Sequence, residues 1–288
     1  DLITFGGHRF LSPQLPWTAI IVGAGTFGAG MVLTRGCISR LTVLTGSGNL
    51  RAASVLVIFA LTAHATLKGV LAPLRTTLAS VTIDLGDMTS LAALPGGVLF
   101  WTLGIAIFAI GMAYRGGARR LHIGLAALIG LLIPLGWLGT GYVLFDEFEP
   151  LAMESLSFTS PAAETLFWGV ASTSISAGFG VGLLGGVIAG ALAMSLLSGQ
   201  FQWQSFSSPR QTGRYLLGGV LMGFGGVLAG GCSVGAGLSG VSTLSLAALL
   251  ALASMIVGAL AMNAFLARVP SRGELGARPA TPNQLPAA

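Results

Sequence analysis

Charged residues are scarce in this chain of 288 residues. Only 8% are Asp, Glu, Lys or Arg, whereas soluble domains contain about 25%. Hydrophobic residues make up 53%, which excludes a soluble globular domain and indicates an integral protein of the lipid bilayer. The apolar residues come in blocks near the roughly 20 residues that a membrane-spanning helix needs. The sequence therefore predicts an all-α membrane protein and not a β-barrel.

The groups that other functional classes require are also missing. Two cysteines and three histidines form no CxxC motif and no metal-ligand spacing. Walker A motifs and paired carboxylates within apolar segments are absent from the sequence, which argues against a pump or a metalloenzyme. The net charge is +5, but the arginines are scattered over loop ends and form no aromatic-interleaved patch. We expect no metal, no cofactor and no nucleic-acid partner.

The sequence contains a duplicated stretch that ends on a cysteine. Residues 28–37 read GAGMVLTRGC and residues 223–232 read GFGGVLAGGC. Counting back from each cysteine, glycine recurs at positions one, seven and nine. With one residue of slippage, residues 44–50 also align with residues 238–244. We interpret the pattern as an internal duplication with one cysteine in each copy, and the sequence leaves a disulfide between the copies open.

The apolar segments define one membrane domain over residues 1–288. We expect a first repeat at 17–71, central helices at 98–145, a second repeat at 166–266 and a disordered cytoplasmic tail at 268–288. The individual segments are 17–36, 52–71, 98–114, 121–145, 166–197, 215–231 and 244–266. The segment at 166–197 is about thirty residues long, so it is either strongly tilted or made of two pieces.

Charge in the connecting segments predicts the orientation. Positive-inside counting assigns the basic turn at 115–120 and the loop around Arg210 to the cytoplasm, and the acidic stretch at 146–164 to a solvated outer loop. The segment before Cys37 then descends from outside, whereas the one before Cys232 rises from the cytoplasm. Such inverted repeats are typical of transporters, whose sites lie near the midplane between the repeats. Nothing apolar precedes residue 17 in the first repeat, so we expect that an N-terminal helix is missing from this chain.

The two cysteine stretches carry the candidate site. Each cysteine follows a glycine-rich helix end, where freed backbone N–H groups can bind an anion and a thiol adds a polarisable contact. The alternative is that each cysteine is a small hydrophobic residue in close packing. The candidate substrate-binding residues are Gly36, Cys37, Ser39, Arg40, Asn49, His64, Gly231, Cys232, Ser233 and Gly235.

Three of these candidates rest on their own chemistry. His64 is an ionisable residue inside an apolar segment, which is a functional candidate by default. Lys68 shares its helix face, but it lies near the segment end and can reach the membrane surface. Arg40 and Asn49 lie beside the first cysteine loop and could attract an anion. Arg40 could equally be a positive anchor at the cytoplasmic surface.

These stretches resemble the two signature motifs of the YeeE/YedE sulfur-transport family. The first is GCISRL at 36–41 followed by GSGNLR at 46–51, and the second is LMGFG at 221–225 followed by GGCSVG at 230–235. The link SGQFQW at 198–203 is also similar to that of the family. The resemblance covers nearly the whole chain.

The resemblance implies a permease of the bacterial inner membrane for thiosulfate or a related sulfur anion. It further implies inverted repeats with short re-entrant helices around a central constriction, where Cys37 and Cys232 handle the substrate in turn. Family members usually carry another cysteine in an N-terminal section, before the point at which this chain begins. A small TusA-like sulfur-carrier protein is the partner that the family implies. The alternatives are a transporter of another sulfur or selenium species, and a membrane sulfurtransferase or redox subunit with persulfide-forming cysteines.

Overall fold

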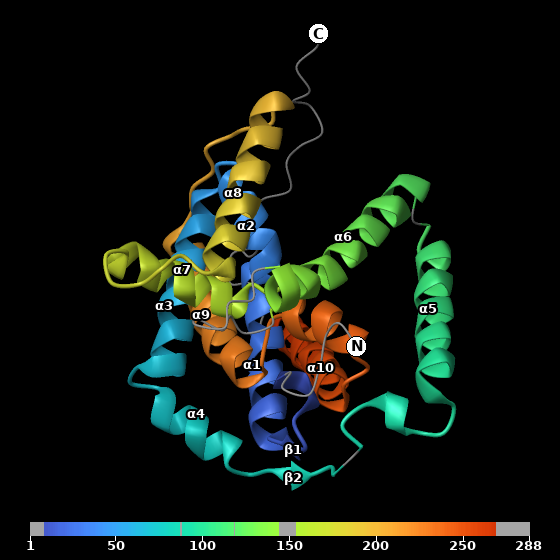
Figure 1. Cartoon of the computed structure of the whole chain (residues 1–288). Coiled ribbons are helices and arrows are strands. Elements are labelled where there is room, and N and C mark those ends of the chain that lie inside the picture. Colours follow the sequence, from blue (N-terminus) through green and yellow to red (C-terminus); the bar gives the residue numbers. More distant parts are fainter. Residues whose placement is uncertain (1–8, 87, 118, 144–153, 269–288) are drawn as a thin grey trace.

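Helices dominate the computed structural model, which describes residues 9–86, 88–117, 119–143 and 154–268 (Figure 1). In chain order the elements are η1 (Arg9–Leu11), β1 (Gln14–Leu15), α1 (Trp17–Thr34), α2 (Ile38–Gly46), α3 (Leu50–Lys68), α4 (Ala72–Ala79), β2 (Ile83–Asp84), η2 (Leu91–Ala93), α5 (Gly97–Arg115), α6 (Arg120–Leu138), η3 (Gly139–Val143), α7 (Thr159–Ala171), α8 (Phe179–Leu197), α9 (Pro209–Leu228), η4 (Gly235–Gly240) and α10 (Leu246–Arg268). Six spans are long and apolar enough to cross a bilayer, the first of which joins α1 and α2. The chain is an all-α, multi-pass membrane protein.

The helices follow the predicted apolar segments closely. The long segment at 166–197 is two pieces, because α7 ends at Ala171 and α8 begins at Phe179. The small polar residues between them form a turn. The predicted tail beyond Arg268 and residues 146–153 of the acidic stretch lie outside the described residues, so the expectations for them stay predictions.

The core lies where the two copies of the duplicated stretch pack together. Helix α1 of the first copy packs against α9 and α10 of the second, and α9 packs in turn against α3 of the first. The helices α1 and α9 run antiparallel, since Gly23 lies beside Leu228 and Gly30 lies beside Gly218. The backbones approach closely through glycine, as is usual for membrane helices.

Matching glycines make the contact between α1 and α9. Gly30 and Gly225 each stand seven residues before a cysteine. A Cβ on Gly30 would lie 3.0 Å from the backbone N of Met222, and one on Gly225 would lie 2.6 Å from that of Phe27. Phe27 and Met222 both stand ten residues before a cysteine. Each copy therefore presents the same positions to the other, which is the pairing expected of a two-fold relation.

The other repeated glycine contacts the last helix of the opposite copy. A Cβ on Gly28 in α1 would lie 2.9 Å from the backbone N of Ala259 in α10. A Cβ on its counterpart Gly223 in α9 would lie 3.1 Å from the backbone N of Ala63 in α3. The glycines seven residues before each cysteine thus form the contact between α1 and α9. The glycines nine residues before each cysteine form the contacts of α1 with α10 and of α9 with α3.

The spanning helices α5 and α6 face outward. Every residue of α5 is exposed or only half buried, and α6 buries only Ile133 and Trp137. Figure 1 shows these two helices as an arm beside the central group. An apolar surface of this kind is stable when lipid covers it.

The central helices have two distinct ends. We call one the Trp17 end, where α1 begins, α9 finishes, and α4 and the β1–β2 pair lie nearby (Figure 1). The opposite end, called the Arg210 end, holds the end of α1 and the start of α9, where Arg214 donates a hydrogen bond from Nη2 to the Val32 carbonyl at 3.3 Å. The two cysteines follow the ends of α1 and α9.

Candidate functional site

The two cysteines, 195 positions apart in the sequence, meet in the structure. The Ser233 hydroxyl donates a hydrogen bond of 2.9 Å to the sulfur of Cys37, and the Cys37 and Cys232 thiols interact directly with each other. Both thiols are free. Cys232 is fully buried and Cys37 is half buried. The duplication therefore brings its two thiols to one place.

Each cysteine starts a short helical segment. Cys37 is the N-cap of α2, and its carbonyl accepts the N–H of Leu41 at 3.1 Å. The Cys232 carbonyl accepts the N–H of Ala236 at 2.8 Å in the same way, just before η4. A thiol at a helix start lies beside backbone N–H groups and the positive end of the helix dipole. This position favours negative charge on the sulfur or on a bound anion.

Backbone N–H groups surround the Cys232 sulfur. Gly235 donates to it at 3.4 Å, and the N–H of Phe158 faces it from the start of α7. Among the described residues, the backbone N–H groups of Ser233 and Val234 have no hydrogen-bond acceptor. These are donors that a ligand could use.

The other predicted residues of the cysteine loops lie close by. Both the hydroxyl and the backbone N–H of Ser39 interact with the Cys37 sulfur. Gly231 leaves room for the next turn, because a Cβ there would lie 3.0 Å from the backbone N of Ala236. Gly36 adjoins Arg40, whose Cδ lies 3.0 Å from the place of a Cβ on that glycine.

Three predicted residues have local partners of their own. The exposed Arg40 donates from Nη1 to the Arg35 carbonyl at the end of α1, at 3.0 Å. Asn49 caps α3 by accepting from the N–H of Ala52 at 3.1 Å, and its amide donates to Gln204. The ring of His64 stacks on Phe167 of α7 at 4.7 Å. In the described part of the chain, no hydrogen bond or ring contact joins Asn49 or His64 to the cysteines.

Sequence reasoning missed two hydroxyl groups at this site. Ser157 and Thr159 are buried, and their hydroxyl oxygens have no hydrogen-bond partner among the described residues. A Cβ on Gly235 would lie 2.7 Å from the Ser157 hydroxyl, and one on Gly226 would lie 3.1 Å from that of Thr159. Buried hydroxyls without partners are uncommon and call for an explanation.

The expectation of a solvated loop at 146–164 is wrong for its second part. Ser155, Ser157 and Phe158 are buried, as is most of the first turn of α7. Four of the five acidic residues that suggested solvation precede this part and Glu164 follows it, whereas residues 155–163 are small, apolar or hydroxylated. In the sequence, only the composition of residues 155–163 could have indicated that this part is buried.

Arginines gather at the Arg210 end. A depression there is lined by Arg35, Arg210 and Arg214, together with Ser207, Ser208, Gln211 and Tyr215. Arg35 lies two residues before Cys37 and caps α1 in the left-handed conformation, with φ of 60°. Gly230, two residues before Cys232, takes the same conformation with φ of 75°. The turn that leads to each cysteine is therefore of one type.

The described residues contain no group of three or more histidine, cysteine or acidic side chains that could hold a metal ion. The chemistry available at the site is that of thiols, hydroxyls and backbone N–H groups. Such groups suit a small anion with a polarisable atom.

Comparison with known proteins agrees with this chemistry. The family described as Sulphur transport matches residues 2–261 of this chain. The thiosulfate transporter TsuA of Escherichia coli (strain K12) is 27% identical over 283 residues, which cover 89% of this chain and 77% of that protein. The thiosulfate transporter TsuA of Spirochaeta thermophila is 27% identical over 274 residues, covering 83% of this chain and 74% of that protein. With the family match extending over nearly all of its length, this chain belongs to the Sulphur transport family, whose members are transporters and not enzymes.

Proposed function

We propose that this chain is a permease that takes up thiosulfate through a passage centred on Cys37 and Cys232. The observation that carries the proposal is the meeting of both thiols, with the Ser233 hydroxyl 2.9 Å from the Cys37 sulfur, between helices that pack through glycine. The names of two relatives supply the substrate, thiosulfate.

The chemistry of thiosulfate fits these groups. Its terminal sulfur is polarisable and can accept a weak hydrogen bond from a thiol, as sulfur does generally. Its oxygens would accept from the unpaired N–H groups of Ser233 and Val234 and from the hydroxyls of Ser157 and Thr159. Replacing hydration by fixed donors lowers the cost of bringing an anion to the membrane midplane. Ser39 and the glycines beside the cysteines would shape the same passage.

We propose further that the two repeats, 17–71 and 166–266, are inverted in the membrane around the central helices at 98–145. The antiparallel contact of α1 with α9 supports this proposal, as do the matching glycine contacts. The arginines of the Arg210 end assign that end to the cytoplasm by the positive-inside rule. In a bacterium the membrane would then be the inner one, and the Trp17 end would face outward.

Transport of radiolabelled thiosulfate into proteoliposomes tests the function. We expect uptake by the wild-type protein and its loss in Cys37→Ser and Cys232→Ser, because a hydroxyl is a poorer partner for sulfur than a thiol. Thr102→Ser in α5 is the control, since the Thr102 hydroxyl bonds only within its own helix. Folded protein without uptake would contradict the proposal, as would full uptake by Cys232→Ser.

Two further measurements separate the alternatives. Competition by sulfite, sulfide and selenium analogues identifies whether another species is the preferred substrate. Mass spectrometry during turnover detects a persulfide, which forms when a thiol takes the terminal sulfur of thiosulfate and its proton leaves with sulfite. Unmodified thiols are the expected result for non-covalent passage.

The TusA-like carrier remains a proposal that follows from the family resemblance. The basic depression formed by Arg35, Arg210 and Arg214 is a suitable surface for an acidic protein. Co-purification with the carrier, compared between wild type and Arg210→Gln, tests this partner.

A further inference from the structure

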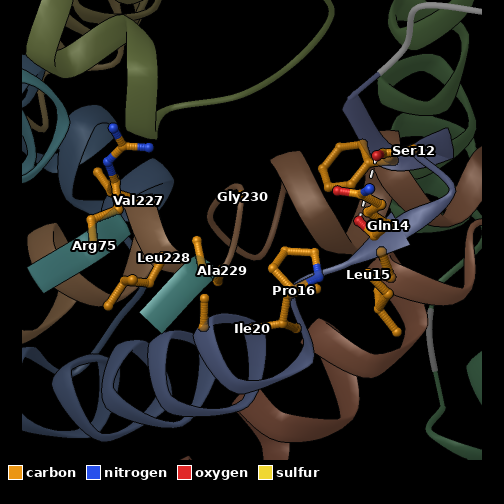
Figure 2. Close-up of a pocket in the computed structure, with 14 residues that line it drawn as sticks. Ser12, Gln14, Leu15, Pro16, Ile20, Arg75, Val227, Leu228, Ala229 and Gly230 are labelled. Atoms are coloured by element: carbon orange, nitrogen blue, oxygen red, sulfur yellow. Dashed lines mark hydrogen bonds between the residues drawn. The ribbon is translucent and has the colours of Figure 1, made fainter. Parts of the chain in front are cut away.

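A cavity opens at the Trp17 end, outside the cysteine site. Its volume is about 320 Å³, and it lies between the start of α1, the end of α9 and the helix α4. The residues that line it are Phe10, Ser12, Gln14, Leu15, Pro16, Ala19, Ile20, Arg75, Ala79, Val227, Leu228, Ala229, Gly230 and Ala247. Figure 2 shows Arg75 on one side, Ser12 and Gln14 on the opposite side, and Leu228 to Gly230 between them.

Arg75 is the only ionisable side chain in this lining. It is half buried, and its Nε is fully buried without a hydrogen-bond partner among the described residues. Among the described residues, the guanidinium of Arg75 forms no ion pair. A partly buried guanidinium without partners is costly, so an anion in the cavity that accepted from its Nη groups would bind favourably.

The cavity lies close to the second cysteine along the chain. Its lining includes Gly230, and the next two residues are Gly231 and Cys232. Gly230 has a φ of 75° and no side chain, so the chain can turn there without narrowing the cavity. An anion held by Arg75 would thus lie at the end of α9, just before the buried thiol.

The mixture of groups selects for one kind of anion. Guanidinium binds two oxygens of a tetrahedral oxyanion through parallel N–H donors. Apart from Arg75, Ser12 and Gln14, the lining is apolar and includes Leu15, Ile20 and Leu228. A polarisable sulfur loses less hydration than an oxygen when it contacts such a wall, which distinguishes thiosulfate from sulfate.

We infer that this cavity is an outer binding site in which Arg75 holds the oxygens of a small sulfur oxyanion before it reaches Cys232. The inference rests on the proposed function and adds a site with its own selectivity. Arg75 acts by binding and takes no part at the thiols. Its loss therefore affects capture more than passage.

Kinetics of radiolabelled thiosulfate uptake into proteoliposomes test the site. We expect Arg75→Gln to raise KM by about tenfold to a hundredfold, the usual effect of losing a hydrogen-bonded charge, with a much smaller change in Vmax. Arg75→Lys should recover part of the affinity, because it restores charge without the paired donors. The matched control is Arg115→Gln, which removes an exposed arginine from the last turn of α5.

Equilibrium binding of thiosulfate to the detergent-solubilised protein separates this inference from the proposed function. Weaker binding by Arg75→Gln than by Arg115→Gln supports the site even where no uptake is found, and the absence of uptake then contradicts the permease alone. Equal KM and equal binding in these two variants would overturn the site, whether or not Cys232→Ser stops transport. Sulfate should compete more weakly than thiosulfate in the wild type, and equal competition would overturn the selectivity.

Discussion

The hydroxyl of Ser233 lies 2.9 Å from the sulfur of Cys37, although 196 positions separate these residues in the sequence. The bond ties the second cysteine loop to the first. It also places a hydroxyl donor beside the more accessible of the two thiols.

Ser233→Ala tests this bond. We expect the protein to fold and transport to fall by several-fold, because a hydrogen bond contributes about 0.5–1.5 kcal/mol and this one orients the Cys37 sulfur. Initial rates of thiosulfate uptake provide the measurement. Ser54→Ala is the control, since Ser54 bonds only to the Leu50 carbonyl one helical turn earlier. Equal uptake rates in the two variants would show that Ser233 has no role in transport.

The buried hydroxyl of Ser157 predicts opposite effects on stability and on transport. Ser157→Ala removes a polar group that has no partner among the described residues, and such a group costs about 1–3 kcal/mol when it is buried. We expect a higher Tm and slower uptake. A lower Tm would indicate that the hydroxyl has a structural partner, and unchanged uptake would exclude a role in binding.

The two thiols should differ in their reaction with a maleimide. Cys37 is half buried whereas Cys232 has 0% exposure, so we expect Cys37 to be labelled first. The chain contains two cysteines, and intact mass followed by peptide mapping identifies each product. Thiosulfate should slow labelling of Cys37. Faster labelling of Cys232 would contradict the burial of its loop.

The glycine contact between α1 and α9 predicts a large effect from one methyl group. A Cβ on Gly225 would lie 2.6 Å from the backbone N of Phe27, and overpacking of this kind costs about 1–3 kcal/mol. We expect Gly225→Ala to lower Tm in detergent. Gly213→Ala on the same helix has open space around it and should be neutral or slightly stabilising. Similar Tm values for both would argue against the close contact.

The turns before the cysteines predict effects of opposite sign. Arg35 has a φ of 60° and Gly230 has a φ of 75°, a conformation that costs an L-residue about 1–2 kcal/mol. Arg35→Gly should therefore maintain or raise Tm, whereas Gly230→Ala should lower it. Thermal unfolding of both variants measures the difference. A destabilised Arg35→Gly would mean that its charge contributes more than the strain it causes.

Much of the fold could be predicted because the signals are local. Blocks of apolar residues predicted most of the helices closely, since a bilayer requires long apolar helices whatever their neighbours, but the starts of α7 and α9 were predicted seven and six residues too late. The break at 172–178 was visible as a run of small polar residues. The burial of residues 155–163 could not be predicted, because their composition is compatible with either a solvated or a packed segment.

The candidate site was predicted in part. The repeated glycine frame singled out Cys37 and Cys232, and the structure brings them together with Ser233 and Ser39. Asn49 was selected for its amide, which caps a helix instead. A cap and a ligand-binding residue look alike in sequence, since both are polar residues beside a helix start.

The sequence by itself determined that this protein is helical, lies in a membrane and carries one thiol in each of two similar copies, because composition and spacing are properties of the chain alone. Only the tertiary structure decided that the thiols meet, that Ser157 and Thr159 lie beside the second cysteine stretch and that Arg75 lines a cavity with Gly230. These contacts depend on how helices pack across long sequence separations. The spacing within a segment does not specify which segment will lie beside it.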